Sequence, residues 1–274
     1  MEERLSKLIK RDSIAMVLYA RFPSEMAYSH HIIQVAKGFE ENNCDVNIYY
    51  PKTYNKKTLK ETPEEYYGNL TNIRFIQINN VDITSFKIYE ISPNFVKKFL
   101  FSLNTFIWAK KLKQNRNENF IWSTNPNILV VAKKYFKHVI YEKHGQAKYI
   151  QKLSISILKK SKNTLMIGVT EFAFNELSKD FNNALYLTNG VDKNFISQKE
   201  KVLSSNRVTI GYIGMLETYG VDKGVLNSIK EIDKLSTETK LNVEVIGGPE
   251  NKLNELRDFI KTASQDKNYL VKSS

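Results

Sequence analysis

The sequence predicts an α/β protein with a complete doubly wound, Rossmann-like domain at residues 1–187, a linker at 188–206 and an incomplete second Rossmann-like domain at 207–274. Short apolar runs typical of strands alternate with helical patterns along the chain. The run SIAMVLYA at residues 13–20 is apolar almost throughout, as in a strand buried on both faces of a parallel sheet. After residue 207, the sequence predicts too few strands and helices to cover both faces of a sheet.

The elements of the first domain follow from local patterns. A helix is predicted at residues 29–42 because apolar residues recur there on one face. Pro126 suits the start of a later helix, and Thr170 followed by Glu171 fits an N-cap with an acidic first turn. The predicted strands are 13–20, 46–50, 73–78, 120–123, 139–142, 165–169 and 184–187, and the predicted helices are 29–42, 93–114, 127–136, 147–160 and 171–180.

The stretch RVTIGYIGMLETYGVDKGV at residues 207–225 predicts a strand that ends at Gly214, a polar loop, and a helix opened by Lys223 and Gly224. Backbone N–H groups and the helix dipole at such a turn attract an anion, and Lys223 adds a full positive charge. The stretch therefore predicts a phosphate or diphosphate pocket, with an ordinary βα connection and a solvated lysine as the alternative. A strand at 243–246, a helix at 252–262 and a strand start at 269–271 follow.

Composition narrows the possible partners. The formal net charge of +12 and the pI of about 9.4 favour polyanions such as nucleotide phosphates or acidic lipid head groups. The lysines are spread along the chain without a nucleic-acid motif, so no nucleic-acid partner is expected. The single Cys44 excludes an intrachain disulfide and a cysteine-cluster metal site. The charged N-terminus lacks the apolar core of a signal peptide, and no apolar run approaches the about 18 residues of a membrane span, so a cytoplasmic location is expected.

Residues 93–114, PNFVKKFLFSLNTFIWAKKLKQ, predict a helix that is rich in phenylalanine and flanked by lysines. One interpretation places this helix in the interface of an anionic membrane, with its aromatic side chains inserted and its lysines at the head groups. The other makes it a core helix of the first domain with its lysines in water. The core interpretation is favoured, because phenylalanine at helical spacing is typical of a core.

Two residues at the end of the predicted strand 139–142 are candidates for chemistry. Glu142 and His144 lie where open α/β sheets bind ligands, and there they can hydrogen-bond a sugar hydroxyl or orient a leaving group. A loop histidine in water fits equally well. His30 and His31 have no third ligand at metal spacing, so no metal site is expected. The first loop lacks G-x-G-x-x-G, which disfavours a nicotinamide or flavin cofactor.

Several stretches form an ordered set of motifs across most of residues 13–272. They are PSEMAYSHHIIQVAKGFEENNCDVNIYYP at 23–51, YEKHG at 141–145, VTEFAFNEL at 169–177, LTNGVDKNF at 187–195, GYIGMLETYGVDKGV at 211–225 and VEVIGGPENKLNELR at 243–257. In this order they resemble family 4 glycosyltransferases of the GT-B fold. YEKHG in particular is similar to a YE-x-H stretch of bacterial surface-polysaccharide transferases.

The resemblance implies a glycosyltransferase that moves a sugar with retention from a UDP- or GDP-sugar to a glycan or lipid-linked acceptor, in cell-surface polysaccharide synthesis and without a further cofactor. It also implies roles for individual residues. His144 and Glu142 would be catalytic, Gly214, Lys223, Gly224, Gly247 and Gly248 would bind the donor, Ser24, Ser29 and His30 would lie on the acceptor side, and Asn189, Gly190 and Asp192 would form the interdomain turn.

Two departures from the family pattern bear on activity. Met215 stands where the family often has an arginine, which leaves one cation fewer. The E-x7-E motif of the family is absent before Ser274, so a C-terminally truncated chain with little activity of its own is expected. The alternatives are a non-catalytic module that binds carbohydrate or a membrane acceptor, with peripheral contact at the inner membrane face, and a nucleotide-sugar epimerase of the GT-B fold.

Overall fold

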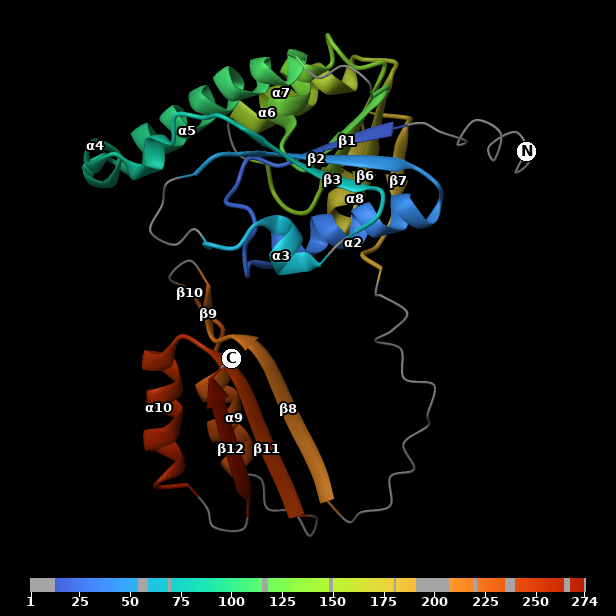
Figure 1. Ribbon diagram of the computed structural model, residues 1–274. Helices are drawn as coiled ribbons and strands as arrows, with labels where there is room; N and C mark the ends of the chain where they lie inside the picture. The colour runs from blue at the N-terminus through green and yellow to red at the C-terminus, as the bar shows by residue number, and fades with distance from the viewer. Residues whose placement is uncertain are drawn as a thin grey trace. The chain divides into compact units, whose positions relative to one another are not determined.

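The computed structural model describes residues 13–53, 59–68, 70–114, 118–147, 150–179, 181–190, 207–218, 221–234, 240–263 and 267–273 (Figure 1). The chain divides into two compact units, Met1–Ile196 and Ser197–Ser274. Each unit is built on a parallel sheet, with seven strands in the first and three in the second. The predicted α/β class, with a doubly wound sheet followed by a smaller one, is confirmed.

The sheet of the first unit has the strand order β3-β2-β1-β4-β5-β6-β7, and all its strand pairs are parallel. The chain order reverses between β1 and β4, which leaves room for a ligand at the carboxyl ends of these two strands. The strands are β1 Ser13–Val17, β2 Asp45–Pro51, β3 Ile73–Ile78, β4 Phe120–Ser123, β5 His138–Lys143, β6 Thr164–Gly168 and β7 Ala184–Tyr186.

Helices cover the two faces of this sheet through two separate apolar cores. In one core, Ile32 and Ala36 of α2 pack with Met16 and Ile48 of the sheet. In the other core, α5, α6 and α7 pack on the opposite face, and Figure 1 shows these helices on the side of the sheet away from α2 and α3. The helices are α2 Ala27–Glu41, α3 Pro63–Tyr67, α4 Lys87–Ile91, α5 Asn94–Ala109, α6 Pro126–Ala132, α7 Ile150–Lys159 and α8 Glu171–Ser178, with 3-10 turns η1 Ile83–Ser85 and η2 Lys110–Gln114.

Helix α5 differs from the prediction in where its phenylalanines lie. The buried side of α5 carries Asn104, Trp108 and Ala109. The side chains of Phe95 and Phe99 are 75% and 57% exposed. The prediction of a core helix is therefore confirmed for α5, which joins the core through Trp108 and Ala109. The prediction that its phenylalanines form the packed side is wrong for Phe95 and Phe99, which lie on the free side. Among the described residues, no helix is both long and apolar enough to cross a membrane.

The second unit has three parallel strands in the order β12-β11-β8 and a small antiparallel hairpin of β9 and β10. Its core joins β11 to both helices through Val243, Val245, Ile229 and Leu253. Ile213 of β8 lies outside this core and is 82% exposed. The elements are β8 Arg207–Met215, β9 Glu217–Thr218, β10 Val221–Asp222, α9 Val225–Lys234, β11 Lys240–Gly248, α10 Glu250–Ile260 and β12 Asn268–Ser273.

Strand β8 continues one residue beyond the predicted end at Gly214, and the predicted polar loop contains the hairpin. Gly214 stands directly opposite Gly247 of β11 in the parallel register. A Cβ atom on Gly247 would lie 1.8 Å from the carbonyl oxygen of Gly214. The two backbones can approach this closely only because residue 247 has no side chain.

Candidate functional site

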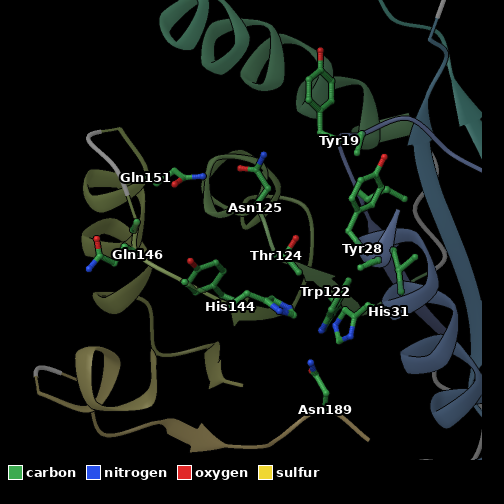
Figure 2. Close-up of a pocket in the computed structure, with 17 residues that line it drawn as sticks. Tyr19, Tyr28, His31, Trp122, Thr124, Asn125, His144, Gln146, Gln151 and Asn189 are labelled. Atoms are coloured by element: carbon green, nitrogen blue, oxygen red, sulfur yellow. The ribbon is translucent and has the colours of Figure 1, made fainter. Parts of the chain in front are cut away.

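A cavity of about 580 Å³ opens at the carboxyl ends of β1, β4 and β5 (Figure 2). We call it the first cavity. Its walls come from the loop after β1, the first turns of α2, and the loops after β4 and β5. It lies where the strand order reverses, which is the usual ligand position in an open α/β sheet. Its polar and aromatic lining includes Tyr19, Tyr28, His31, Trp122, Asn125 and His144.

Two histidines and a glutamate meet at this cavity. Nε2 of His31 lies 2.6 Å from Oε1 of Glu142, and Nε2 of His144 lies 2.7 Å from the same oxygen. The two imidazole rings are nearly perpendicular, with centroids 4.7 Å apart. Figure 2 shows them pointing toward one another, His31 from α2 and His144 from the end of β5. The structure thus brings the predicted pair Glu142 and His144 together with a third residue, His31.

Glu142 is the fixed point of this cluster. Its side chain is 7% exposed, and the indole N–H of Trp122 donates a hydrogen bond of 3.2 Å to its second oxygen, Oε2. Burial alone would raise the pKa of Glu142, but the hydrogen bonds from His144 and His31 outweigh burial and lower the pKa to about 2. Glu142 is therefore ionised at neutral pH, with each of its oxygens accepting a hydrogen bond.

The end of β5 explains why a carboxylate stands here. Tyr141, Glu142 and Lys143 are all buried, and strand alternation sends Glu142 to the α2 side and its neighbours to the other side. Tyr141 joins the core formed with α5, α6 and α7. Lys143 forms an ion pair with Glu176 of α8. Both charges at this strand end are therefore paired, each on its own face of the sheet.

The three residues predicted on the acceptor side do not line the first cavity. The hydroxyl of Tyr67 donates to Oγ of Ser29 at 2.6 Å and accepts from the backbone N–H of Ser24 at 3.3 Å. His30 packs against the ring of Tyr67, with centroids 5.9 Å apart. Ser24 and Ser29 thus join α3 to the start of α2, and His31, one residue beyond His30, is the histidine that reaches the cavity.

The predicted interdomain turn contributes to two cavities. Asn189 lines the first cavity, and both Asn189 and Gly190 line a second cavity of about 650 Å³. This second cavity lies between α2 and the apolar side chains of β5 and β6, and His31 and Glu142 are also among its lining residues. Asp192 lies outside the described residues. The histidine–glutamate cluster therefore stands where the two cavities meet.

The predicted donor residues of the second unit gather at the carboxyl ends of β8 and β11. Gly214 pairs with Gly247, and Met215 pairs with Gly248. The backbone N–H of Leu216 donates to the carbonyl oxygen of Gly248 at 2.7 Å. Because Gly247 is needed for the contact between the two strands, its presence is explained without a ligand. The structure brings these glycines together, and their role toward a ligand stays a prediction.

Lys223 and Gly224 close the same loop at the start of α9. The backbone N–H of Lys223 donates to the carbonyl oxygen of Leu216 at 2.8 Å, while its side chain is exposed. Gly224 has a φ of 71°, which favours glycine, and its N–H donates to Oδ1 of Asp222 at 2.6 Å. That hydrogen bond, and an ion pair with Lys252 at 3.2 Å, lower the pKa of Asp222. These hydrogen bonds fix the backbone of Lys223 and Gly224, and the Lys223 side chain is exposed.

Sequence reasoning missed the role of His31 and the clamp by Trp122. His31 and Glu142 are 111 positions apart, so no spacing along the chain shows their contact. The one usable signal was that the start of α2 and the end of β5 both lie at the carboxyl edge of the sheet. For the same reason, the spacing of ligand types around His30 and His31 in the sequence does not reveal Glu142 or His144 as possible metal ligands. The three side chains offer ligand atoms that all lie within 4.8 Å of one another.

No family model matches the sequence, and no curated protein matches it. Solved structures match it in fold. The lipopolysaccharide outer core galactosyltransferase WaaB gives a TM-score of 0.60 at 12% identity, over 96% of this chain and 68% of WaaB. MurG of Acinetobacter baumannii gives 0.51 at 13% identity, over 94% of this chain and 65% of MurG. A putative UDP-N-acetylglucosamine 2-epimerase from Listeria monocytogenes gives 0.53 at 11% identity, over 95% of this chain and 69% of the epimerase.

Identities this low establish the fold alone. The matches confirm the predicted GT-B fold, in which one Rossmann-like unit follows another. The chain spans about two thirds of the length of these matched structures, which have 65%, 68% and 69% of their residues covered.

Proposed function

We propose that the chain is part of a retaining glycosyltransferase that resembles family 4. The enzyme would move a sugar from a UDP- or GDP-sugar to a glycan or lipid-linked acceptor of the cell surface. The observation that carries this proposal is the first cavity, with His144 held at its wall by a buried glutamate. The GT-B fold and the ordered motifs support it. The expected location is the cytoplasm.

In this proposal His144 is the residue that touches the sugar. Its side chain is 39% exposed, so the ring can reach a bound ligand, while Glu142 fixes the orientation of the ring. A histidine held in this way can donate to or accept from a sugar hydroxyl without reorganising when the ligand arrives. Glu142 acts through His144 and His31, and is a positioning residue.

The donor phosphates are assigned to the loop of the second unit. The N-terminus of α9 and the exposed Lys223 offer positive charge, and Gly214 and Gly224 keep side chains away from the backbone there. A cation at this place would stabilise a departing nucleoside diphosphate. Met215, at the end of β8, adds no charge.

Titration calorimetry with UDP-glucose and GDP-mannose tests the donor assignment. Lys223→Ala is expected to weaken binding of the preferred donor about fivefold, which corresponds to about 1 kcal/mol for one cation at a helix terminus. Lys234→Ala is the matched control, because Lys234 is an exposed lysine in the last turn of the same helix. Equal affinities of wild type and Lys223→Ala would contradict the assignment, and so would the absence of nucleotide-sugar binding by the wild type.

An epimerase shares the fold, as the Listeria match illustrates, but the first cavity suits that reaction less well. Epimerisation needs an acid and a base whose pKa lies near the working pH. The hydrogen bonds from both histidines lower the pKa of Glu142 to about 2, so this carboxylate is a weak base and is never protonated at neutral pH. Analysis of the sugar released from the donor distinguishes the reactions, since an epimerase yields a stereoisomer and a transferase yields free nucleotide and a glycosylated acceptor.

A second candidate function, binding to an anionic membrane, is favoured by the free side of α4 and α5. We call this surface the α4–α5 stripe. Its side chains are large, apolar and exposed, and a group of such side chains is uncommon on the surface of a monomeric protein unless it binds a partner or a membrane. Positions four apart fall on one side of a helix, as the last four of its members do. The stripe consists of Ile88, Ile91, Phe95, Phe99, Leu103 and Ile107.

Charge around the stripe complements an anionic surface. The lysines nearby in the sequence are Lys87, Lys97, Lys98, Lys110 and Lys111, and the one acidic residue between 87 and 111 is Glu90. Phenylalanines would enter the acyl boundary while the lysines meet the head groups. Helix α5 is also connected to the first cavity, because its Phe101, which is not part of the stripe, packs edge-on against the lining residue Tyr19 with centroids 5.3 Å apart. A membrane-bound α5 would therefore hold the cavity close to a lipid-linked acceptor.

Sedimentation with vesicles tests the stripe. The protein is expected to sediment with vesicles that contain phosphatidylglycerol and to stay in solution with pure phosphatidylcholine. Replacing Phe95 and Phe99 with serine should reduce the bound fraction about tenfold, because two apolar side chains no longer enter the bilayer. Leu153→Ser is the matched control, since Leu153 is an apolar side chain of α7 that is 64% exposed. Equal binding by the double variant and the control would remove the stripe from the proposal.

A further inference from the structure

We propose that His31, Glu142 and His144 form a binding site for a divalent transition-metal ion. The proposal does not rest on the transfer reaction, because it follows from the ligand atoms alone. Two imidazole nitrogens and one carboxylate oxygen suit Zn²⁺ and neighbouring first-row ions, whereas Mg²⁺ and Ca²⁺ prefer oxygen ligands only. Among the described residues, these three make up the one group of histidine, cysteine and carboxylate side chains with this convergence.

The three ligand atoms are arranged much as in a metal site from which the ion has been removed. Nε2 of each histidine, a common metal-ligand atom, faces the same oxygen of Glu142, at 2.6 and 2.7 Å. A bound ion would lie about 2.0–2.2 Å from each ligand atom, which requires ligand atoms about 3 Å or more apart. The imidazoles must therefore withdraw by several tenths of an ångström. His144 can do so, because it follows the end of β5 and its side chain is 39% exposed.

Trp122 supplies the outer support that such a site needs. Its indole N–H holds Oε2 of Glu142 at 3.2 Å and leaves Oε1 toward the two histidines. Metal-ligating carboxylates are oriented by hydrogen bonds of this kind, and the loss of such a bond commonly weakens metal affinity by about tenfold or more. Trp122 is itself buried, so this orientation is set by the core of the first unit.

The two cavities beside the cluster indicate a metal site with free coordination positions, and not a structural site in which the protein fills every position. Both cavities, of about 580 and 650 Å³, are lined by His31, so water or a ligand can reach an ion at the cluster from two sides. Three protein ligands with free positions are typical of zinc that binds a fourth, exchangeable ligand. In the competing interpretation, the carboxylate accepts hydrogen bonds from the two imidazoles and the cluster binds no metal. The two interpretations differ in whether an added ion replaces those hydrogen bonds.

Titration of the chelator-treated, untagged full chain with Co²⁺ alone distinguishes them. Co²⁺ held by two imidazoles and a carboxylate gives visible d–d absorption, which added Zn²⁺ should abolish by displacement. We expect one equivalent of Co²⁺ to produce this band in the wild type and in His30→Ala. His30 is the matched control, because it is the neighbouring histidine on α2 and packs against Tyr67 instead of Glu142.

His144→Ala and Glu142→Gln should each weaken Co²⁺ binding by more than about tenfold, since each removes one ligand of three. Circular dichroism of the metal-free variants shows whether they are folded, and His144→Ala is the safer variant because its side chain is half-exposed and lies in a loop. The wild type should also gain thermal stability with Co²⁺, and folded His144→Ala should not. No absorption band in the wild type, or an unchanged band in folded His144→Ala, would overturn the proposal.

Discussion

The first cavity and the loop before α9, called the donor loop after its proposed role, hold their charged groups in opposite ways. At the first cavity Glu142 is buried, and two imidazoles and an indole satisfy its carboxylate. In the donor loop the backbone is fixed by hydrogen bonds, but Lys223 is exposed and the pair of Asp222 and Lys252 lies at the surface. The first site therefore has its charged groups already paired, whereas the second fixes the backbone of Lys223 and Gly224 and leaves the Lys223 side chain exposed.

The two sheets account for this difference. Seven strands with a core on each face provide an interior in which a carboxylate can be desolvated and still find three donors. In the described part of the second unit, the parallel sheet has three strands and packs on one core, and Ile213 of β8 is exposed. A sheet of that size has little interior in which to bury charge, so its polar groups remain at the strand ends.

The largest expected effect on stability is at the backbone contact between β8 and β11 in the second unit. Gly247→Ala should destabilise the second unit by about 3 kcal/mol, because the new Cβ would meet the carbonyl oxygen of Gly214 and force β8 and β11 apart. Gly211→Ala is the control in the same strand pair, since a Cβ there meets no atom within 4 Å. Hydrogen exchange should show faster exchange in β8 and β11 of Gly247→Ala only. Equal protection in both variants would mean that the strand contact tolerates a side chain.

A smaller effect is expected at the first cavity. Glu142→Ala should lower the free energy of unfolding by about 2 kcal/mol, because Trp122 and His31 lose the acceptor of a charge-assisted hydrogen bond in a buried place. Glu25→Ala is the control: Glu25 pairs with Arg21 at the surface, and such a pair contributes about 0.5 kcal/mol or less. Denaturant unfolding gives both values. A Glu142→Ala variant as stable as Glu25→Ala would show that the cluster is not prearranged.

The smallest effects are expected in the donor loop. Asp222→Ala should lower the unfolding temperature of the second unit more than Lys252→Ala does, because Asp222 also accepts the backbone N–H of Gly224 at the start of α9. Lys252→Ala removes two ion pairs, with Asp222 and Glu255, but both lie at the surface and contribute little to stability. Scanning calorimetry measures both variants. The reverse order would mean that the ion pair, and not the backbone, shapes this loop.

Much of the fold could be predicted from the sequence, because strands buried in a parallel sheet are nearly continuous apolar runs. SIAMVLYA was recognisable for this reason, and β1 is an interior strand of the sheet with β2 and β4 on either side. Helical spacing was less informative for α5: it showed that Phe95 and Phe99 share one side of the helix, but not which side is packed. That choice depends on Trp108 and Asn104 meeting the rest of the unit, which is a tertiary fact.

The candidate site was predictable only in part. Glu142 and His144 could be selected because a strand end of a parallel sheet is a functional position whatever its neighbours are. Their partner His31 could not, since the contact needs α2 to fold back beside β5. Ser24 and Ser29 show the converse: a small polar residue near a predicted site can be fully engaged with a structural partner, here Tyr67.

Trp122 has one more consequence. The chain contains two tryptophans, and they stand at the two places where function is proposed: Trp122 donates to Glu142, and Trp108 on the buried side of α5 lies 5.2 Å from the ring of Tyr19. Each is nearly free of solvent, so their emission depends on the groups packed around them. With Trp108→Phe the intrinsic fluorescence of the protein becomes an optical report on the carboxylate cluster, and with Trp122→Phe it becomes a report on α5. The two tryptophans thus provide separate optical probes, one for the cluster around Glu142 and one for α5.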